Sequence, residues 1–135
     1  MKKAALFLMC AIIFSSCYDV TGPDEEKLLY GSWVLVRISG GFSGTTTDVS
    51  PEEGSKVVFT EAGSVLYYSK GALERSTTFI VKKGKSIYFT EEKNIIHFAD
   101  RPELPMVIMK ADKDTLILAD NAYDGFSFTY MKEKY

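Results

Sequence analysis

The stretch LLYGSWVLVRISGG, from Leu28 to Gly41, limits the folds that the rest of the chain can adopt. It sets a dense run of strand-forming residues, Trp33 to Ile38, between Gly31 and a Gly40-Gly41 pair that ends the run. Gly31 allows a sharp turn into the strand, and the only tryptophan of the chain follows two residues later. An aromatic side chain of that size can close one end of whatever the strands enclose. The stretch therefore predicts the opening strand of a small β-barrel.

From residue 56 onward, short runs of strand formers alternate with brief turn signals, and no helical period is present. The last run alternates cleanly, with Phe128, Tyr130 and Lys132 on one face. Neighbouring hairpins favour an all-β, up-and-down antiparallel barrel of about eight strands over a sandwich. After the opening strand, the predicted strands are Lys56–Thr60, Ser64–Lys70, Leu73–Lys82, Lys85–Thr90, Ile95–Phe98, Met106–Ala111, Thr115–Ala119 and a last strand from Phe126.

Two longer connections interrupt this pattern. The segment Gly40 to Ser55 has no strand pattern and four glycines, which predicts a flexible flap over one opening of the barrel. A second loop, Asp120 to Gly125, precedes the last strand.

The N-terminus is typical of an export signal. Lys2-Lys3 is followed by an apolar run, Ala4 to Phe14, which is shorter than the roughly 20 residues that a transmembrane helix needs. The run ends in Phe14-Ser-Ser-Cys17, which resembles the lipobox of bacterial lipoproteins of the Bacteroidetes type. The resemblance implies that residues 1–16 are a lipoprotein signal peptide and that Cys17 becomes the acylated first residue of the mature chain.

The remaining cysteine supports this interpretation. Cys10 would leave with the signal peptide, so the mature chain would keep one thiol and form no internal disulfide. Acyl chains such as palmitate on Cys17 would hold the protein at the membrane, and residues 17–27 would serve as a flexible tether. We expect a bacterial cell-envelope location at the outer membrane, with the periplasmic and surface faces both open. The alternative is an ordinary signal peptide with an incidental cysteine.

The predicted barrel resembles the lipocalin-like domains of such lipoproteins over residues 28–135. Four short phrases carry the resemblance: Gly31-x-Trp33, Phe59–Gly63, Asp114–Leu118 and Phe128-x-Tyr130-x-Lys132. It implies that Trp33 packs against Lys132 at the closed end of the barrel, a cation–π contact of about 0.5 to 2 kcal/mol. It also implies a protein that binds a small hydrophobic or amphipathic molecule.

No residue pattern predicts catalysis. His97 is the only histidine, so the residues for a histidine–cysteine metal site or for a nucleophilic triad are not all present in a suitable context. We therefore expect no enzyme, metal or cofactor. The acid pairs Glu52-Glu53 and Glu91-Glu92 lie in predicted turns, where adjacent carboxylates are solvated. The formal net charge is −2, and scattered lysines form no basic stripe, which excludes a nucleic-acid partner.

Aromatic residues are the candidate ligand contacts. Tyr67 and Tyr68 are adjacent in a strand, so one of them faces inward. We expect Tyr67, Tyr88, Phe42 and Tyr123 to contact a ligand. The same aromatic content could instead fill the barrel completely. Two functions therefore stay open: a ligand-binding barrel, or an anchored, non-catalytic module that binds a protein or glycan through its loops or outer face. The sequence leaves the oligomeric state open.

Overall fold

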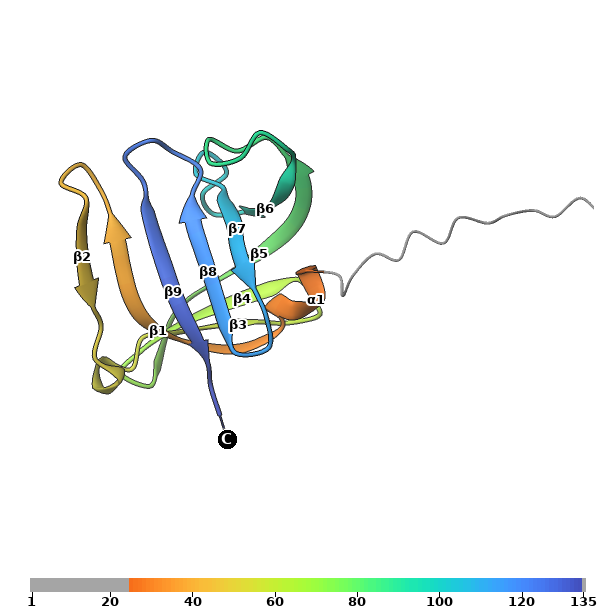
Figure 1. Ribbon diagram of the computed structural model, residues 1–135. Coiled ribbons are helices and arrows are strands. Elements are labelled where there is room, and N and C mark those ends of the chain that lie inside the picture. Colours follow the sequence, from red (N-terminus) through yellow and green to blue (C-terminus); the bar gives the residue numbers. More distant parts are fainter. Residues whose placement is uncertain (1–24, 135) are drawn as a thin grey trace, which may run out of the picture.

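The protein is a closed antiparallel β-barrel, shown in a computed structural model that describes residues 25–134 (Figure 1). Eight strands pair in the order β1-β3-β4-β5-β6-β7-β8-β9, and β1 pairs with β9 to close the sheet. Strand β2 is an extra strand that pairs with β1 alone. This confirms the predicted all-β barrel. The strands are β1 (Gly31–Gly40), β2 (Thr45–Asp48), β3 (Lys56–Phe59), β4 (Ser64–Ser69), β5 (Ala72–Gly84), β6 (Lys93–Phe98), β7 (Met106–Ala111), β8 (Thr115–Asp120) and β9 (Phe126–Lys132).

Strand β1 organises the barrel because it has three partners. Its first half, Gly31 to Val34, pairs with β3, and its second half, Arg37 to Gly40, pairs with β2. Its other edge pairs with β9 along almost its whole length, with an irregularity between Leu35 and Arg37. The strand therefore closes the barrel on one edge and branches on the other.

A short helix, α1 (Glu25–Leu29), precedes β1, so the opening strand begins at Gly31 and not at Leu28 as predicted. Leu29 is fully buried, and its carbonyl accepts a 2.6 Å hydrogen bond from the Trp33 indole. Asn94 Nδ2 donates to Glu25 at 2.7 Å. The helix forms because it buries Leu29 against the end of the barrel, a tertiary gain that the local sequence does not signal. It takes up the last residues of the range expected to be tether.

The predicted flap contains secondary structure. Strand β2 lies in it, followed by a 3₁₀ turn, η1 (Pro51–Glu53), that Ser50 caps. Gly41 and Gly44 turn the chain with positive φ angles of 74° and 62°. The expectation of a strandless segment was therefore wrong, because the three threonines of β2 can extend the sheet beside the second half of β1.

The predicted strand Lys85–Thr90 is absent, and β5 instead continues through the expected hairpin at Lys83-Gly84. Side chains bond the backbone of residues 85–89 in place of a ladder. Asn121 accepts from the Ile87 amide at 3.0 Å and donates to the Lys85 carbonyl at 3.2 Å. Ser86 Oγ accepts from the amides of residues 88 and 89. The segment is thereby fixed onto the turn after β8 as an irregular loop.

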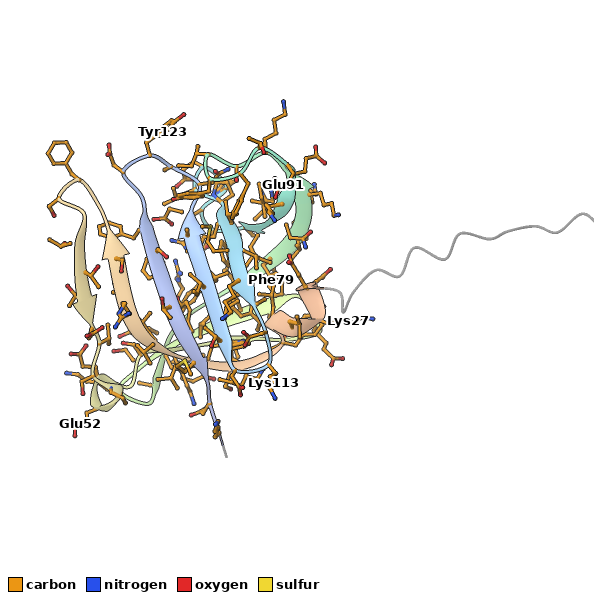
Figure 2. The ribbon with its side chains drawn as sticks, in the orientation of Figure 1. Lys27, Glu52, Phe79, Glu91, Lys113 and Tyr123 are labelled. Atoms are coloured by element: carbon orange, nitrogen blue, oxygen red, sulfur yellow. The ribbon has the colours of Figure 1, made fainter. Side chains whose placement is uncertain are left out.

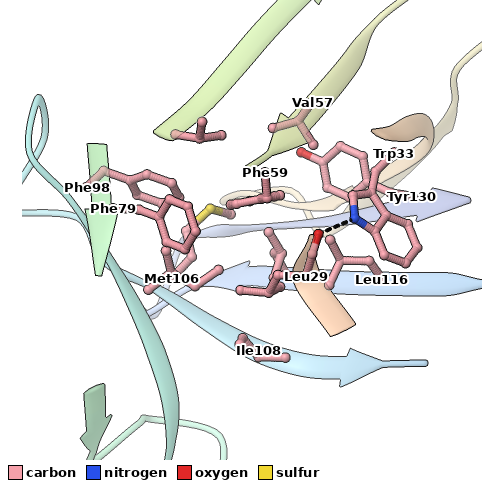
Figure 3. Packing of buried hydrophobic residues seen from close by; sticks show 13 residues of the cluster. Leu29, Trp33, Val57, Phe59, Phe79, Phe98, Met106, Ile108, Leu116 and Tyr130 are labelled. Atoms are coloured by element: carbon pink, nitrogen blue, oxygen red, sulfur yellow. Dashed lines mark hydrogen bonds between the residues drawn. The ribbon is translucent and has the colours of Figure 1, made fainter. Parts of the chain in front are cut away.

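Large apolar side chains fill most of the interior (Figure 3). Phe59 and Phe79 meet edge to face with ring centroids 5.1 Å apart. The other buried members include Trp33, Val65, Ile96, Phe98, Met106, Ile108, Leu116 and Leu118. Of the two alternatives left open, a filled and a hollow barrel, the interior is closer to the filled one, and a cavity remains beside the core.

The predicted signal peptide, Cys17 and most of the tether lie outside the described residues. Within residues 25–134, no helix is long and apolar enough to cross a membrane.

Candidate ligand site inside the barrel

Trp33, Lys132 and helix α1 form what we call the closed end of the barrel. Trp33 is fully buried, and Lys132 Nζ lies 4.3 Å from the centroid of its ring system. The structure thus brings together the two residues that the resemblance pairs. The same ammonium donates a 2.6 Å hydrogen bond to the Tyr30 carbonyl. Burial lowers the pKa of Lys132, since desolvation disfavours its charged form.

Gly31 is required by this arrangement. Its φ angle is +120°, and a Cβ atom there would collide with Lys132 Nζ. The lysine cannot yield freely, because its ammonium is held against Trp33 and the Tyr30 carbonyl. Glycine at position 31 therefore leaves the space in which the Lys132 side chain crosses the start of β1 and reaches Trp33.

A cavity of about 210 Å³ lies at the start of β3 and the end of β4, and we call it the tyrosine cavity. Four of its lining residues belong to the core or pack against it: Leu35, Val57, Tyr67 and Tyr130. The others lie nearer the surface: Ser55, Lys56, Tyr68, Ser69 and Glu74. The volume is below the 300–1,000 Å³ typical of drug-sized sites, so the cavity suits a smaller molecule.

Two tyrosines give this cavity its polar character. Burial raises the pKa of Tyr67 and of Tyr130, because each loses the water that would stabilise a phenolate. Both hydroxyl groups therefore stay protonated and able to donate at neutral pH. The guanidinium carbon of Arg75 lies 4.0 Å from the centroid of the Tyr67 ring, and its Nη1 pairs with Asp100 at 3.0 Å.

Arg101 lies in the β6–β7 connection and is not among the residues that line the tyrosine cavity. Its positive charge acts on both Tyr67 and Tyr130, in each case lowering the phenol pKa against the larger effect of burial. Its guanidinium lies 4.9 Å from the Phe98 ring centroid, and its Nη2 lies 3.4 Å from the Met106 sulfur. Its Nε is buried with no hydrogen-bond partner among the described residues. A buried donor without an acceptor is unusual and costly.

A second buried atom, Asp120 Oδ1, also has no partner in this part of the chain. The other carboxylate oxygen accepts from the Phe126 amide at 3.0 Å. The side chain is about 5% exposed and does not line the tyrosine cavity.

Of the four residues expected to contact a ligand, the structure places only Tyr67 in this cavity. The Tyr88 hydroxyl instead donates to the Asp120 carbonyl at 2.7 Å. Phe42 and Tyr123 are 97% and 91% exposed, and Tyr123 projects from its loop away from the barrel (Figure 2). The sequence analysis missed Arg75 and Arg101.

A second cavity of similar volume lies between β5 and β6, where Ile80 and His97 contribute to its lining. No group of three or more potential metal ligands occurs among residues 25–134.

The structure thus defines a small closed β-barrel, packed at one end, with a cavity of mixed apolar and polar lining. Comparison with family models, with curated proteins and with solved structures found no match.

Proposed function

We propose that this protein is a membrane-anchored, lipocalin-like lipoprotein whose barrel binds a small hydrophobic or amphipathic molecule. The tyrosine cavity is the observation that carries the proposal. Its floor is apolar through Leu35 and Val57, and its polar groups are few, which is the usual composition of a small-molecule site. The cavity is partly open to solvent beside Ser55, Tyr68 and Glu74, which gives a small molecule a way in.

Native mass spectrometry of the purified protein tests binding directly. We expect a one-to-one adduct with a short-chain amphiphile such as octanol, with a dissociation constant in the micromolar range. Tyr67→Trp should fill the cavity and abolish the adduct, whereas Tyr123→Trp, on an exposed loop, should leave it intact. Adducts of equal yield in both variants would contradict binding in the barrel.

Anchoring rests on the Phe14-Ser-Ser-Cys17 phrase and the apolar run before it. Two or more acyl chains give stable membrane attachment, because each buried CH₂ contributes about 0.8 kcal/mol. Cys17→Ala should abolish palmitate labelling and leave the signal peptide uncleaved, whereas Cys10→Ala should have neither effect. Continued labelling of Cys17→Ala would contradict the lipoprotein assignment.

A second function is favoured by the exposed aromatics. The loops that carry Phe42 and Tyr123 are joined by a 3.1 Å bond from the Gly41 amide to the Gly125 carbonyl. Two nearly fully exposed rings on neighbouring loops suit an anchored module that binds a protein or glycan. Loss of partner capture in a Phe42→Ser, Tyr123→Ser double variant, with small-molecule binding unchanged, would support this function.

A further inference from the structure

Glu74 is the acidic residue in the lining of the tyrosine cavity, and it lies at a β-bulge. Across β4 and β5, Tyr68 pairs with Leu73 and Tyr67 pairs with Arg75, so Glu74 is the extra residue between the two pairs. A bulge changes the direction of the side chain that it carries, and bulges are frequent beside functional sites. The position of Glu74 at the cavity therefore depends on a local break in the ladder.

Two cationic groups next to the cavity are paired within the protein, whereas Glu74 is not. Lys56 also lines the cavity, but its ammonium donates to both carboxylate oxygens of Glu133, at 3.2 and 3.3 Å. Arg75 pairs with Asp100 at 3.0 Å. Glu74 is exposed and has no ion pair among residues 25–134. The unpaired charge of the lining is therefore negative.

Arg101 and Asp120 lie outside the lining, carry opposite charges and form no ion pair in the described part of the chain. Arg101 acts on both inner tyrosines, Tyr67 and Tyr130, whereas Asp120 acts on Tyr130 alone of the two. The inner part of the cavity therefore disfavours a positive group. A cation belongs at the opening, where Glu74 lies.

The opening also carries an aromatic ring with a cation already against it. Lys56 Nζ lies 5.4 Å from the centroid of the Tyr68 ring. Tyr68 lines the cavity together with Glu74, Ser55 and Ser69. An aromatic face attracts ammonium groups, and serine hydroxyl oxygens can accept from their N–H bonds. The opening thus combines a ring, an unpaired carboxylate and hydroxyl acceptors.

We propose that the tyrosine cavity binds a small amphipathic cation, with its ammonium group near Glu74 and Tyr68 at the opening and its apolar body against Leu35 and Val57. This inference rests on the proposed ligand-binding function and specifies the charge of the ligand. The chain has a net charge of −2 and attracts any cation weakly, so the experiment has to separate this site from the overall charge.

Calorimetric titration with three ligands of equal chain length tests the proposal: octylammonium, octanol and octanoate. An exposed ion pair and one cation–π contact should make octylammonium bind about three- to tenfold more tightly than octanol, and octanoate should bind most weakly. Glu74→Gln should remove the preference for octylammonium and leave the affinity for octanol unchanged. Glu61→Gln, the same loss of one negative charge on an exposed turn outside the lining, should retain the preference.

The role of the ring has its own variant. Tyr68→Leu keeps an apolar side chain but lacks the aromatic face, so it should lower the affinity for octylammonium more than the affinity for octanol. An unchanged ratio of the two affinities would contradict the contact with Tyr68.

The remaining outcomes separate the cation inference from the proposed function. Equal affinity for octylammonium and octanol, or tightest binding of octanoate, would overturn the cation inference and leave small-molecule binding in place. An equal loss of preference in Glu74→Gln and Glu61→Gln would overturn it as well, because the preference would then come from the overall charge. Absence of binding by all three ligands would overturn both proposals.

Discussion

The closed end and the tyrosine cavity are built from the same strands but satisfy their polar groups differently. At the closed end, the Trp33 indole bonds the Leu29 carbonyl and the Lys132 ammonium bonds the Tyr30 carbonyl. Elsewhere the pairing is incomplete: Arg101 Nε, on the β6–β7 connection, is buried without a partner among the described residues, and the tyrosine cavity is partly open at the surface. The comparison indicates that the polar groups of the closed end are paired within the barrel, whereas Arg101 keeps a buried donor without a partner among the described residues.

The largest expected effect is at the closed end. Trp33→Ala removes a fully buried indole and should lower the free energy of unfolding by about 3 to 5 kcal/mol. Tyr68→Ala, in the more exposed lining of the tyrosine cavity, should cost only about 1 kcal/mol. Urea denaturation measures both values. Similar losses in the two variants would remove the distinction between the regions.

A smaller effect should follow from Gly31→Ala. The new methyl group displaces the Lys132 ammonium and sits on a backbone with a φ angle of +120°, so we expect a loss of about 1 to 3 kcal/mol. Gly44→Ala is the matched control, because its φ is also positive at +62° but the space around it is open. Thermal denaturation should show the larger shift for Gly31→Ala. A larger shift for Gly44→Ala would mean that the closed end tolerates crowding.

The third effect appears only in alkali. Burial raises the pKa of Tyr130 above its usual value of about 10, so the folded state holds this proton more firmly than the unfolded state. The stability that the protonated Tyr130 contributes to the folded state is fully present below about pH 10 and is lost as the pH rises above that value. Lys132 acts with the opposite sign, because its pKa is lowered and the folded state releases its proton first.

Urea midpoints measured from about pH 9 to 11 should therefore fall less steeply in Tyr130→Phe than in the parent protein. Tyr123→Phe is the control, since that ring is 91% exposed and should not change the slope. An identical slope in all three proteins would show that Tyr130 is not shielded from water.

The sequence predicts the barrel well because its strands rely on local alternation and on short turns. The inward positions of Tyr130 and Lys132 follow directly from the period of two in the last strand. Helix α1 and the 85–92 loop are different, because Leu29 and Asn121 stabilise them through contacts that exist only in the folded protein. The burial of Arg101 Nε could not be predicted, since its connection has no periodicity that fixes where a side chain points.

The central claim is that the tyrosine cavity, and not the exposed loops, binds a small amphipathic molecule. The most direct measurement is a titration of the isotope-labelled protein with octanol, followed by heteronuclear NMR. We expect saturable shifts at Leu35, Val57, Tyr67 and Tyr130, with the signals of the exposed Phe42 and Tyr123 unchanged. Shifts confined to Phe42 and Tyr123, or no saturable shifts at all, would contradict the claim.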